Sequence, residues 1–382
     1  MITKQNAEAL FSEDLIAEII QGVVKQSAAL SMFRQLPNMT SNVMRMRVLD
    51  ALPMAYWVDE GANNGRKNLT EAAWDNKFIV PAELAVIVPI KENVLDDASI
   101  DIWGEIRPRL VEAIGKKIDQ AIFVGFDKPA SWRADLLSSI AQAGAYVPQA
   151  SGTTLYSAIN DAMVKVEESG YNVTGVIGGV DVKGKFRMML DTAGQPIKGT
   201  EIDSLPKAYI DNGAWDKSKA QMIIGDFTQA VYAIRQDITY KVLDQAVIQD
   251  PSTGSIKYNL AQEDMVALRV VMRLGWEIPN PITALQPDET VRFPFAAIQA
   301  ASALTTQTST FTVTSDGSTP VEGAKVTLGG LTAKTNSSGV ATIKAQAGTY
   351  PYTVKATGYQ TYKGTLVVDG AEDVDITLSE AT

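Results

Sequence analysis

The most regular part of the chain is the stretch LVEAIGKKIDQAI, which spans residues 110–122. Around it, apolar residues recur at intervals of four, at positions 102, 106, 110, 114, 118 and 122. This spacing is typical of one face of an α-helix, and it predicts a helix over 99–124, about 25 residues or roughly 37 Å long. Residues 96–97 offer capping carboxylates and Gly125 is a good stop, whereas Pro108 should kink the helix or move its start later.

Two extended stretches precede this helix. Residues 43–49 alternate loosely between apolar and polar side chains, and residues 77–88 form a second extended stretch. Between them, residues 60–68 read EGANNGRKN, a Gly- and Asn-rich segment with turn chemistry. The pattern predicts a long two-stranded ribbon within 43–90. Because an isolated ribbon is marginally stable in water, we expect its flanks to lie on another subunit.

The first 42 residues have the character of an arm. Apolar residues at positions 15, 16, 19, 20, 23 and 24 predict a short amphipathic helix. Such a helix needs a surface to cover, either on its own subunit or on a neighbour.

Helices and strands alternate after the long helix. The expected order is a helix, a strand, a short helix and three strands, over 155–166, 173–180, 183–190, 222–224, 230–235 and 238–242. A last strand over 266–274 has strict period-two alternation, with Arg269 and Arg273 on its polar face. Interleaved elements of this kind indicate an α+β core.

The composition changes near residue 296. Residues 296–308 are rich in Ala, Ser, Thr and Gln and predict a linker. Residues 309–382 predict an all-β sandwich, because turn signals separate short strands at regular spacing. The strands are expected at 309–314, 324–328, 331–335, 339–345, 350–356, 362–368 and 373–378.

Composition excludes several classes of function. The chain has 382 residues, a formal net charge of −10, no histidine and no cysteine. Without these residues it lacks the commonest general base, the commonest zinc ligand and thiolate chemistry. An acidic total also argues against nucleic-acid binding as the main role. No signal peptide and no apolar run of about 20 residues is present, so we expect a soluble product made in the cytoplasm, with no membrane partner.

Catalytic motifs are missing as well. A Ser-His-Asp triad is excluded, and neither a GxxxxGK[ST] phosphate loop nor a GxGxxG motif occurs. The acidic pairs at 96–97 and 167–168 fit capping or solvated surface, and the Gly-rich run at 176–179 fits a turn. A carboxylate-only hydrolase would need two placed acids, and the sequence singles out no such pair. We therefore predict that the chain is not an enzyme and needs no cofactor or metal.

Charged residues are the candidates for contacts instead. Four basic residues share the polar side of the long helix, where they either face solvent or contact a neighbouring subunit or enclosed nucleic acid. The ribbon tip carries charges that either solubilise it or pair with the next subunit. The candidate inter-subunit residues are Glu60, Arg66, Lys67, Arg107, Arg109, Lys116, Lys117, Asp264 and Arg269.

The order of arm, ribbon, long helix, α+β body and late strand resembles the major capsid proteins of tailed bacteriophages, which have the Hong Kong 97-type fold. Residues 110–122 look like that family's spine helix, with Glu-Ala-Ile followed by Asp-x-Ala. Residues 259–269, NLAQEDMVALR, look like its late segment, centred on Val-Ala-Leu-Arg. The resemblance covers about residues 1–290.

The resemblance implies a division of the chain into the family's parts. These are an N-terminal arm, an extended loop with flanking peripheral-domain strands, a peripheral domain with the spine helix, an axial domain and a return to the peripheral domain, over 1–42, 43–90, 91–149, 150–235 and 236–295.

It also implies a function. Subunits would assemble as pentamers and hexamers into the icosahedral head of a virion, in the host cytoplasm, around double-stranded DNA that touches the inner face non-specifically. Partners would be other copies and a portal, and shell stability would come from non-covalent contacts between subunits or from a decoration protein. Because the body begins almost at Met1, a separate scaffolding protein is expected, unless none is needed. The alternatives are an encapsulin-type nanocompartment shell and, from another class, a surface adhesin or carbohydrate-binding protein.

Some members of the family form covalent Lys-to-Asn cross-links beside a catalytic Glu. Here Asp264 falls where that Asn would be, and the Glu position is about Val271. We therefore expect no autocatalytic cross-linking, although Lys67 lies near the loop tip.

The C-terminal part resembles immunoglobulin-like or carboxypeptidase-regulatory-like domains of phage virion proteins. The resemblance rests on PVEGAKVTL at 320–328, TNSSGVAT at 335–342, AGTYPYTV at 347–354 and the Gly-Tyr pair at 358–359. It implies a domain that the linker carries clear of the shell on the outer surface. There it would bind glycans weakly through many copies, or serve as a passive decoration.

Overall fold

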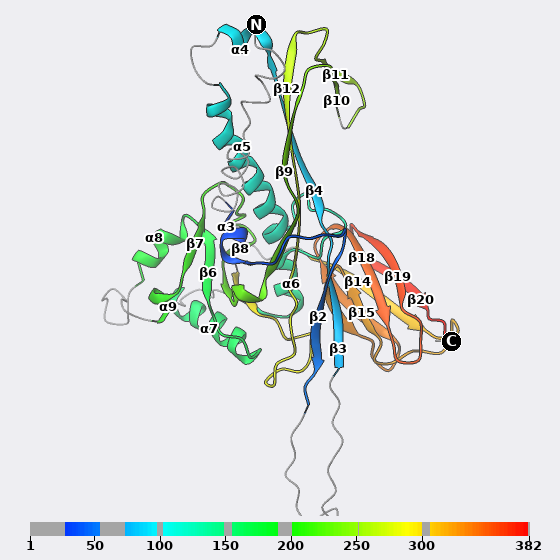
Figure 1. The fold of residues 1–382 in the computed structure, drawn as a ribbon. Helices are drawn as coiled ribbons and strands as arrows, with labels where there is room; N and C mark the ends of the chain where they lie inside the picture. Colours follow the sequence, from blue (N-terminus) through cyan, green and yellow to red (C-terminus); the bar gives the residue numbers. More distant parts are fainter. Residues whose placement is uncertain are drawn as a thin grey trace, which may run out of the picture.

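The computed structural model describes residues 27–53, 73–97, 102–148, 155–189, 201–250, 252–299 and 306–380. The expected helix at 15–24 and the ribbon tip at 60–68 lie outside these residues. Figure 1 shows a long helix beside long strands, a second α/β region on one side, a projecting ribbon and a β domain that ends the chain.

The long helix is confirmed over most of its expected length. Helix α5 (Ile102–Asp119) continues directly into a π-helical turn, η2 (Gln120–Val124), which ends at Gly125 with φ of 74°. Pro108 lies within α5 without ending it. The expected apolar stripe is buried from Leu110 onward, because it packs against the sheets on either side. The short helix α4 (Glu92–Asp97) precedes α5.

The long strands form a sheet in the order β1-β9-β12-β4. Its members are β1 (Arg34–Gln35), β9 (Val231–Leu243), β12 (Met265–Glu277) and β4 (Ala82–Lys91). The expectation of two strands at 230–235 and 238–242 is wrong, because β9 runs through both. The polar residues between them face a shift of register near Arg273 of β12, so the chain forms an irregularity in the ladder instead of a turn.

Strict alternation along β12 is also only partly observed. Nearly every residue of the strand is buried, and Arg269 is the exposed exception. At its far end, a small hairpin of β10 (Val247–Gln249) and β11 (Ile256–Asn259) covers Leu260 and Met265.

A second sheet has the order β5-β13-β8-β6-β7. Its strands are β5 (Tyr146–Val147), β13 (Phe295–Gln299), β8 (Ala220–Gly225), β6 (Gly175–Gly179) and β7 (Lys207–Ile210). The surrounding helices are α6 (Leu136–Gln142), α7 (Leu155–Glu168), α8 (Val182–Arg187), α9 (Glu201–Ser204) and the 3-10 turn η3 (Phe227–Gln229).

Strand β13 corrects two expectations. A linker from residue 296 is wrong at its start, because Ala296, Ala297 and Ile298 are fully buried in this sheet. The small side chains of the two alanines suit a crowded interior strand, and an Ala-rich composition alone does not distinguish such a strand from a flexible segment. The sheet also takes β5 and β13 from outside the expected 150–235 domain, and residues 231–235 of that range belong instead to β9 of the first sheet.

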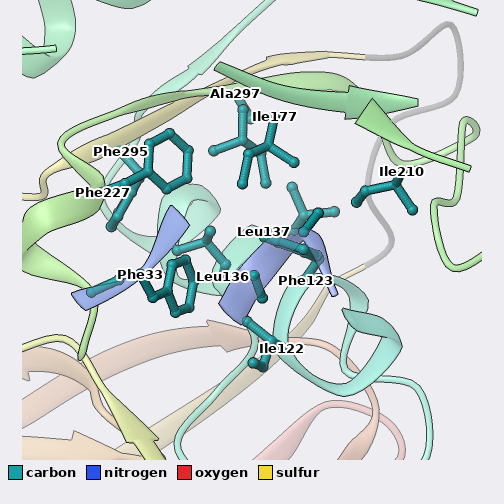
Figure 2. Packing of buried hydrophobic residues seen from close by; sticks show 14 of the residues in the cluster. Phe33, Ile122, Phe123, Leu136, Leu137, Ile177, Ile210, Phe227, Phe295 and Ala297 are labelled. Atoms are coloured by element: carbon teal, nitrogen blue, oxygen red, sulfur yellow. The ribbon is translucent and has the colours of Figure 1, made fainter. Parts of the chain in front are cut away.

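One large hydrophobic core joins both regions. Figure 2 shows Phe33, Phe227 and Phe295 packed together, with Phe123 and Leu137 below the strands that carry Ile177 and Ala297. Phe33 follows the short helix α3 (Ala28–Met32) and its ring lies 6.3 Å from those of Phe123 and Phe227. The root of the arm is therefore part of the core.

The C-terminal β domain consists of two sheets, in the orders β17-β14-β20 and β16-β15-β18-β19. Phe311, Val326 and Tyr350 are among the residues buried between them. The seven expected strands are confirmed, although the first begins at Gln307. They are β14 (Gln307–Thr314), β15 (Lys325–Leu328), β16 (Leu331–Lys334), β17 (Val340–Ala345), β18 (Gly348–Lys355), β19 (Tyr362–Val368) and β20 (Glu372–Thr377).

The ribbon consists of β2 (Met44–Ala51) and β3 (Ala73–Ile79), which pair in antiparallel fashion. Together they project from the body beside the C-terminal β domain (Figure 1). None of the helices in the described residues is long and apolar enough to span a membrane.

Candidate functional site

The two faces of the ribbon differ sharply. Along β3, Trp74 and Phe78 point away from the body with 66% and 51% of their surface exposed, whereas Ile79 is buried. On β2, Arg45 lies opposite Phe78 and Arg47 opposite Asn76, and both arginines are exposed. We call Arg45, Arg47, Trp74 and Phe78 the ribbon face. Exposed aromatic and Arg side chains of this kind dominate the energetics of protein–protein contacts.

The opposite face of β3 forms a network of ion pairs. Lys77 Nζ lies 2.6 Å from Glu289 Oε1, and Lys325 of the C-terminal β domain bonds the other oxygen of Glu289. Lys355 Nζ and Lys325 Nζ lie 3.1 Å and 3.7 Å from the carboxylate of Asp75. We call these five residues the ribbon junction. Burial would raise the pKa of Glu289, but Lys77 and Lys325 outweigh it and lower this pKa to about 2.

A cleft of about 680 Å³ surrounds the ribbon junction. Its walls come from β3, from the body near Arg133 and Arg292, and from strands β15 and β18 of the C-terminal β domain. The cleft shows that these three parts meet without filling all the space between them.

The root of the arm is held by one buried carboxylate. Asp119, at the end of α5, accepts hydrogen bonds from Ser27 Oγ at 2.6 Å, from the amides of Ala28 and Ala29 at 3.1 Å, and from Asn212 Nδ2 at 3.0 Å. Burial raises the pKa of Asp119, and these hydrogen bonds oppose the rise. Asp119 therefore joins the arm, the long helix and the loop after β7.

The C-terminal β domain is anchored to the body by a second buried cluster. Gln346 Nε2 donates to Asp135 Oδ2 at 2.7 Å and to Ser138 Oγ at 3.0 Å, and Lys219 bonds Gln346 Oε1. Burial raises the pKa of Asp135, and its hydrogen bonds with Ser138 lower it. The segment before this domain therefore does not hold it apart from the body of its own subunit, because the domain buries polar side chains against that body. Its placement on the outer surface of a shell stays a prediction.

The predicted contact residues do not gather into one site. Glu60, Arg66 and Lys67 lie outside the described residues, and Arg107 lies in α5, where its side chain is not described. Arg109 pairs with Glu112 at 3.3 Å on the exposed helix surface. The basic residues predicted on α5 are separated because the helix places them at different points along its length.

The remaining predicted residues lie at three separate places. Lys117 pairs with Asp127 at 2.7 Å, and Lys116 is half-buried on the same helix. Asp264 is exposed with φ of 49°, and its carbonyl accepts the amide of Glu92 at 2.9 Å. Arg269 is exposed on β12, opposite Lys241.

Sequence reasoning missed the ribbon face, the ribbon junction and Asp119. The period-two placement of Trp74, Asn76 and Phe78 is a visible signal for one strand face. The ribbon junction leaves no such signal, because its charges come from residues that are far apart in the chain. Among the described residues, no group of three or more acidic, His or Cys side chains could hold a metal ion.

Comparison with known proteins finds similar proteins from bacteriophages, both by sequence and by structure. A curated relative, the major capsid protein of Staphylococcus phage 80alpha, is 22% identical over 281 residues, which cover 72% of this chain and 84% of the relative. A solved structure from Mycobacterium phage Bobi matches with a TM-score of 0.65 and 32% identity, over 79% of this chain and 100% of the other. One from Microbacterium phage Oxtober96 matches with a TM-score of 0.64 and 33% identity, over 78% and 99%.

The phage capsid family as a whole matches residues 8–286. This match includes the ribbon, α5 and both sheets except β13, and it ends before the C-terminal β domain. Because the match covers more than half of the chain, the chain belongs to the phage capsid family, a family of structural proteins of the virion.

Proposed function

We propose that the chain assembles as pentamers and hexamers into an icosahedral phage head that encloses double-stranded DNA. In this proposal α5 and the β1-β9-β12-β4 sheet form the peripheral domain of a Hong Kong 97-type subunit. The β5-β13-β8-β6-β7 sheet forms the axial domain, and the ribbon is the base of the extended loop. A separate scaffolding protein and a portal would complete the head.

The ribbon face is the observation that carries the proposal. Trp74 and Phe78 lie on the same face of an element that is too thin to have a core of its own, four residues apart with Asn76 between them. Their exposed surface is roughly 250 Å², from the size of such rings. Covering it would contribute about 6 kcal/mol before the entropic cost of association is subtracted. A contact this modest is useful when every subunit of a shell repeats it.

Arg45 and Arg47 give the ribbon face its chemical preference. Neither makes an ion pair with a described residue, and the chain as a whole carries a formal charge of −10. A second copy therefore offers an acidic surface on average, which favours the approach of this basic and aromatic strip. Contact of the head with DNA would be weak and non-specific, because an acidic chain repels the phosphate backbone.

The test uses a double variant, Trp74→Ala with Phe78→Ala, in the full chain. Negative-stain microscopy at high concentration, with the scaffold supplied, should show closed particles for the wild type. For the variant we expect at least about tenfold fewer particles with an unchanged thermal midpoint, because exposed side chains contribute little to the fold of one subunit. Val367→Ala removes another exposed side chain, on the C-terminal β domain, and should assemble normally.

Two results would contradict the proposal. Closed particles from the double variant at wild-type yield would show that the ribbon face is not an assembly contact. A wild-type chain that forms neither capsomers nor closed particles under these conditions would exclude assembly itself.

A further inference from the structure

We propose that the C-terminal β domain is a brace, which binds the inner face of the ribbon and the body of the same chain and so sets the direction of the ribbon. This role goes beyond the assembly function, because it acts within a single subunit. It also differs from surface decoration, which would require no specific contact between this domain and the ribbon.

The first support is the anchor to the body. Besides the Gln346 cluster, the amide of Ala134 donates to the carbonyl of Gly329, and Ala134 lies within the core of the C-terminal β domain. The amide of Lys344 donates to Gln142 Oε1 at 2.8 Å. The bonds of Gln346 to Asp135 and Ser138 are buried and would leave polar groups unsatisfied if the domain moved, and the exposed bond of Lys344 adds to them, so together they fix the orientation of the domain. The brace therefore has a rigid base.

The second support is the ribbon junction, which is the contact between the brace and the ribbon. Every charged side chain on the inner face of β3 has a partner there. Asp75 meets Lys325 and Lys355 of the C-terminal β domain, and Lys77 shares Glu289 with Lys325. Glu289 has 13% of its side chain exposed, so it is shielded from water on most sides. Shielded charge-assisted bonds resist rotation of the ribbon more strongly than surface pairs do.

The third support is that the two faces of β3 make different contacts. Alternate residues of a strand point to opposite sides, so Asp75 and Lys77 face the brace while Trp74 and Phe78 face outward. The brace leaves the ribbon face uncovered. It can therefore hold the ribbon in place without competing with a contact on the other side.

The brace would fix the direction in which the ribbon leaves the body. A two-stranded ribbon has no third strand to define its direction, and its own pairing is marginal. Ion pairs at its base, near the point where it leaves the body, restrain it at the position where a small rotation would move the far end most. Lys355, whose side chain is half exposed, adds a second and weaker tie on the same side.

The test is hydrogen exchange on the unassembled full chain with Glu289→Gln. This change keeps the shape of the side chain and removes the charge that Lys77 and Lys325 share. We expect the amides of β2 and β3 to exchange at least about tenfold faster, the effect of losing one charge-assisted bond. Amides of β15 and β18 inside the C-terminal β domain should keep their wild-type rates. Asp373→Asn, an exposed carboxylate on β20, is the matched control and should change neither set.

Lys355→Gln provides a second variant, because it removes only the half-exposed tie and is not expected to disturb folding. It should raise exchange in β3 by a smaller factor, about twofold to threefold, as expected for a surface pair. Wild-type exchange in β2 and β3 for both variants would overturn the brace. Because no particle is needed for this measurement, its failure would leave the assembly proposal standing, and failure of assembly would leave the brace standing.

Discussion

Replacement of Asp119 by Ala is the sharpest test of how the arm is attached. The substitution removes the acceptor of four hydrogen bonds, from Ser27, Ala28, Ala29 and Asn212. These residues are buried, at 0% to 8% exposure, so water does not readily replace the carboxylate. Each buried donor left without a partner costs about 1–3 kcal/mol, and some donors find new partners as the site relaxes. We therefore expect a loss of about 3–5 kcal/mol for the contact of the arm with the body.

Because the damage is concentrated at one end of the chain, local opening should precede global unfolding. The assay is hydrogen exchange and limited proteolysis of the unassembled chain, read at α3 and β1. Urea unfolding of the same samples gives the change in total free energy of unfolding. Exchange in α3 should rise about a hundredfold or more, while exchange in β14 of the C-terminal β domain stays constant.

Asp127→Ala is the matched control. Asp127 also follows α5, but its pair with Lys117 is exposed, with 44% and 70% of the two side chains accessible. An exposed pair contributes about 0.2–1 kcal/mol, and Ala at the positive φ of this position, 54°, adds about 1 kcal/mol, so the control should lose about 2 kcal/mol at most and none of it at α3. If Asp119→Ala and Asp127→Ala differed by less than about 0.5 kcal/mol in both assays, the reasoning about buried donors would be refuted.

Three further predictions concern the brace, the second sheet and helix α8. The pKa of Glu289 in the folded chain, about 2, lies below its ordinary value of 4.5, so its stabilising effect is complete above that ordinary value and disappears as the pH falls towards 2. Protection of β2 and β3 amides should fall over this pH range in the wild type, and the fall should be smaller in Glu289→Gln. Gly225→Ala would bring a methyl group to 2.6 Å from Phe295 Cδ1 and closer still to the Pro294 carbonyl, so urea unfolding should show a loss of about 2–4 kcal/mol. Gly184→Ala, in helix α8 with open space around it, should instead stabilise the chain by about 0.5–1 kcal/mol.

The parts that sequence predicted best are those in which one element carries its own signal. The i, i+4 stripe through Ile114 and Ile118 defines α5 because a helix buries one face wherever it lies in the fold. The strands of the C-terminal β domain were located for a similar reason, since Gly-containing turns separate them. The largest differences are at the starts of two strands, Gln307 of β14 and Gly348 of β18, which each begin two residues early.

The parts that sequence did not predict depend on contacts between distant segments. Gln236 and Asp237 have the polarity of a turn, yet β9 runs through them, and a shift of register against β12 accommodates the irregularity. Glu289 and Asp75 have no local pattern that distinguishes them from ordinary surface acids. Their importance arises only when β15 and β18 bring lysines to them, and such a convergence requires three-dimensional coordinates.

Strand β13 has a practical consequence for anyone who shortens this chain. It lies between β5 and β8 in its sheet, yet it begins at Phe295, nine residues after the family match ends at residue 286. A fragment cut at that boundary would leave β5 without its neighbour and would open a bare edge along β8, the kind of edge that recruits other chains and aggregates. During synthesis, too, the sheet stays incomplete until residue 299 has left the ribosome, so the body cannot finish folding before this strand emerges.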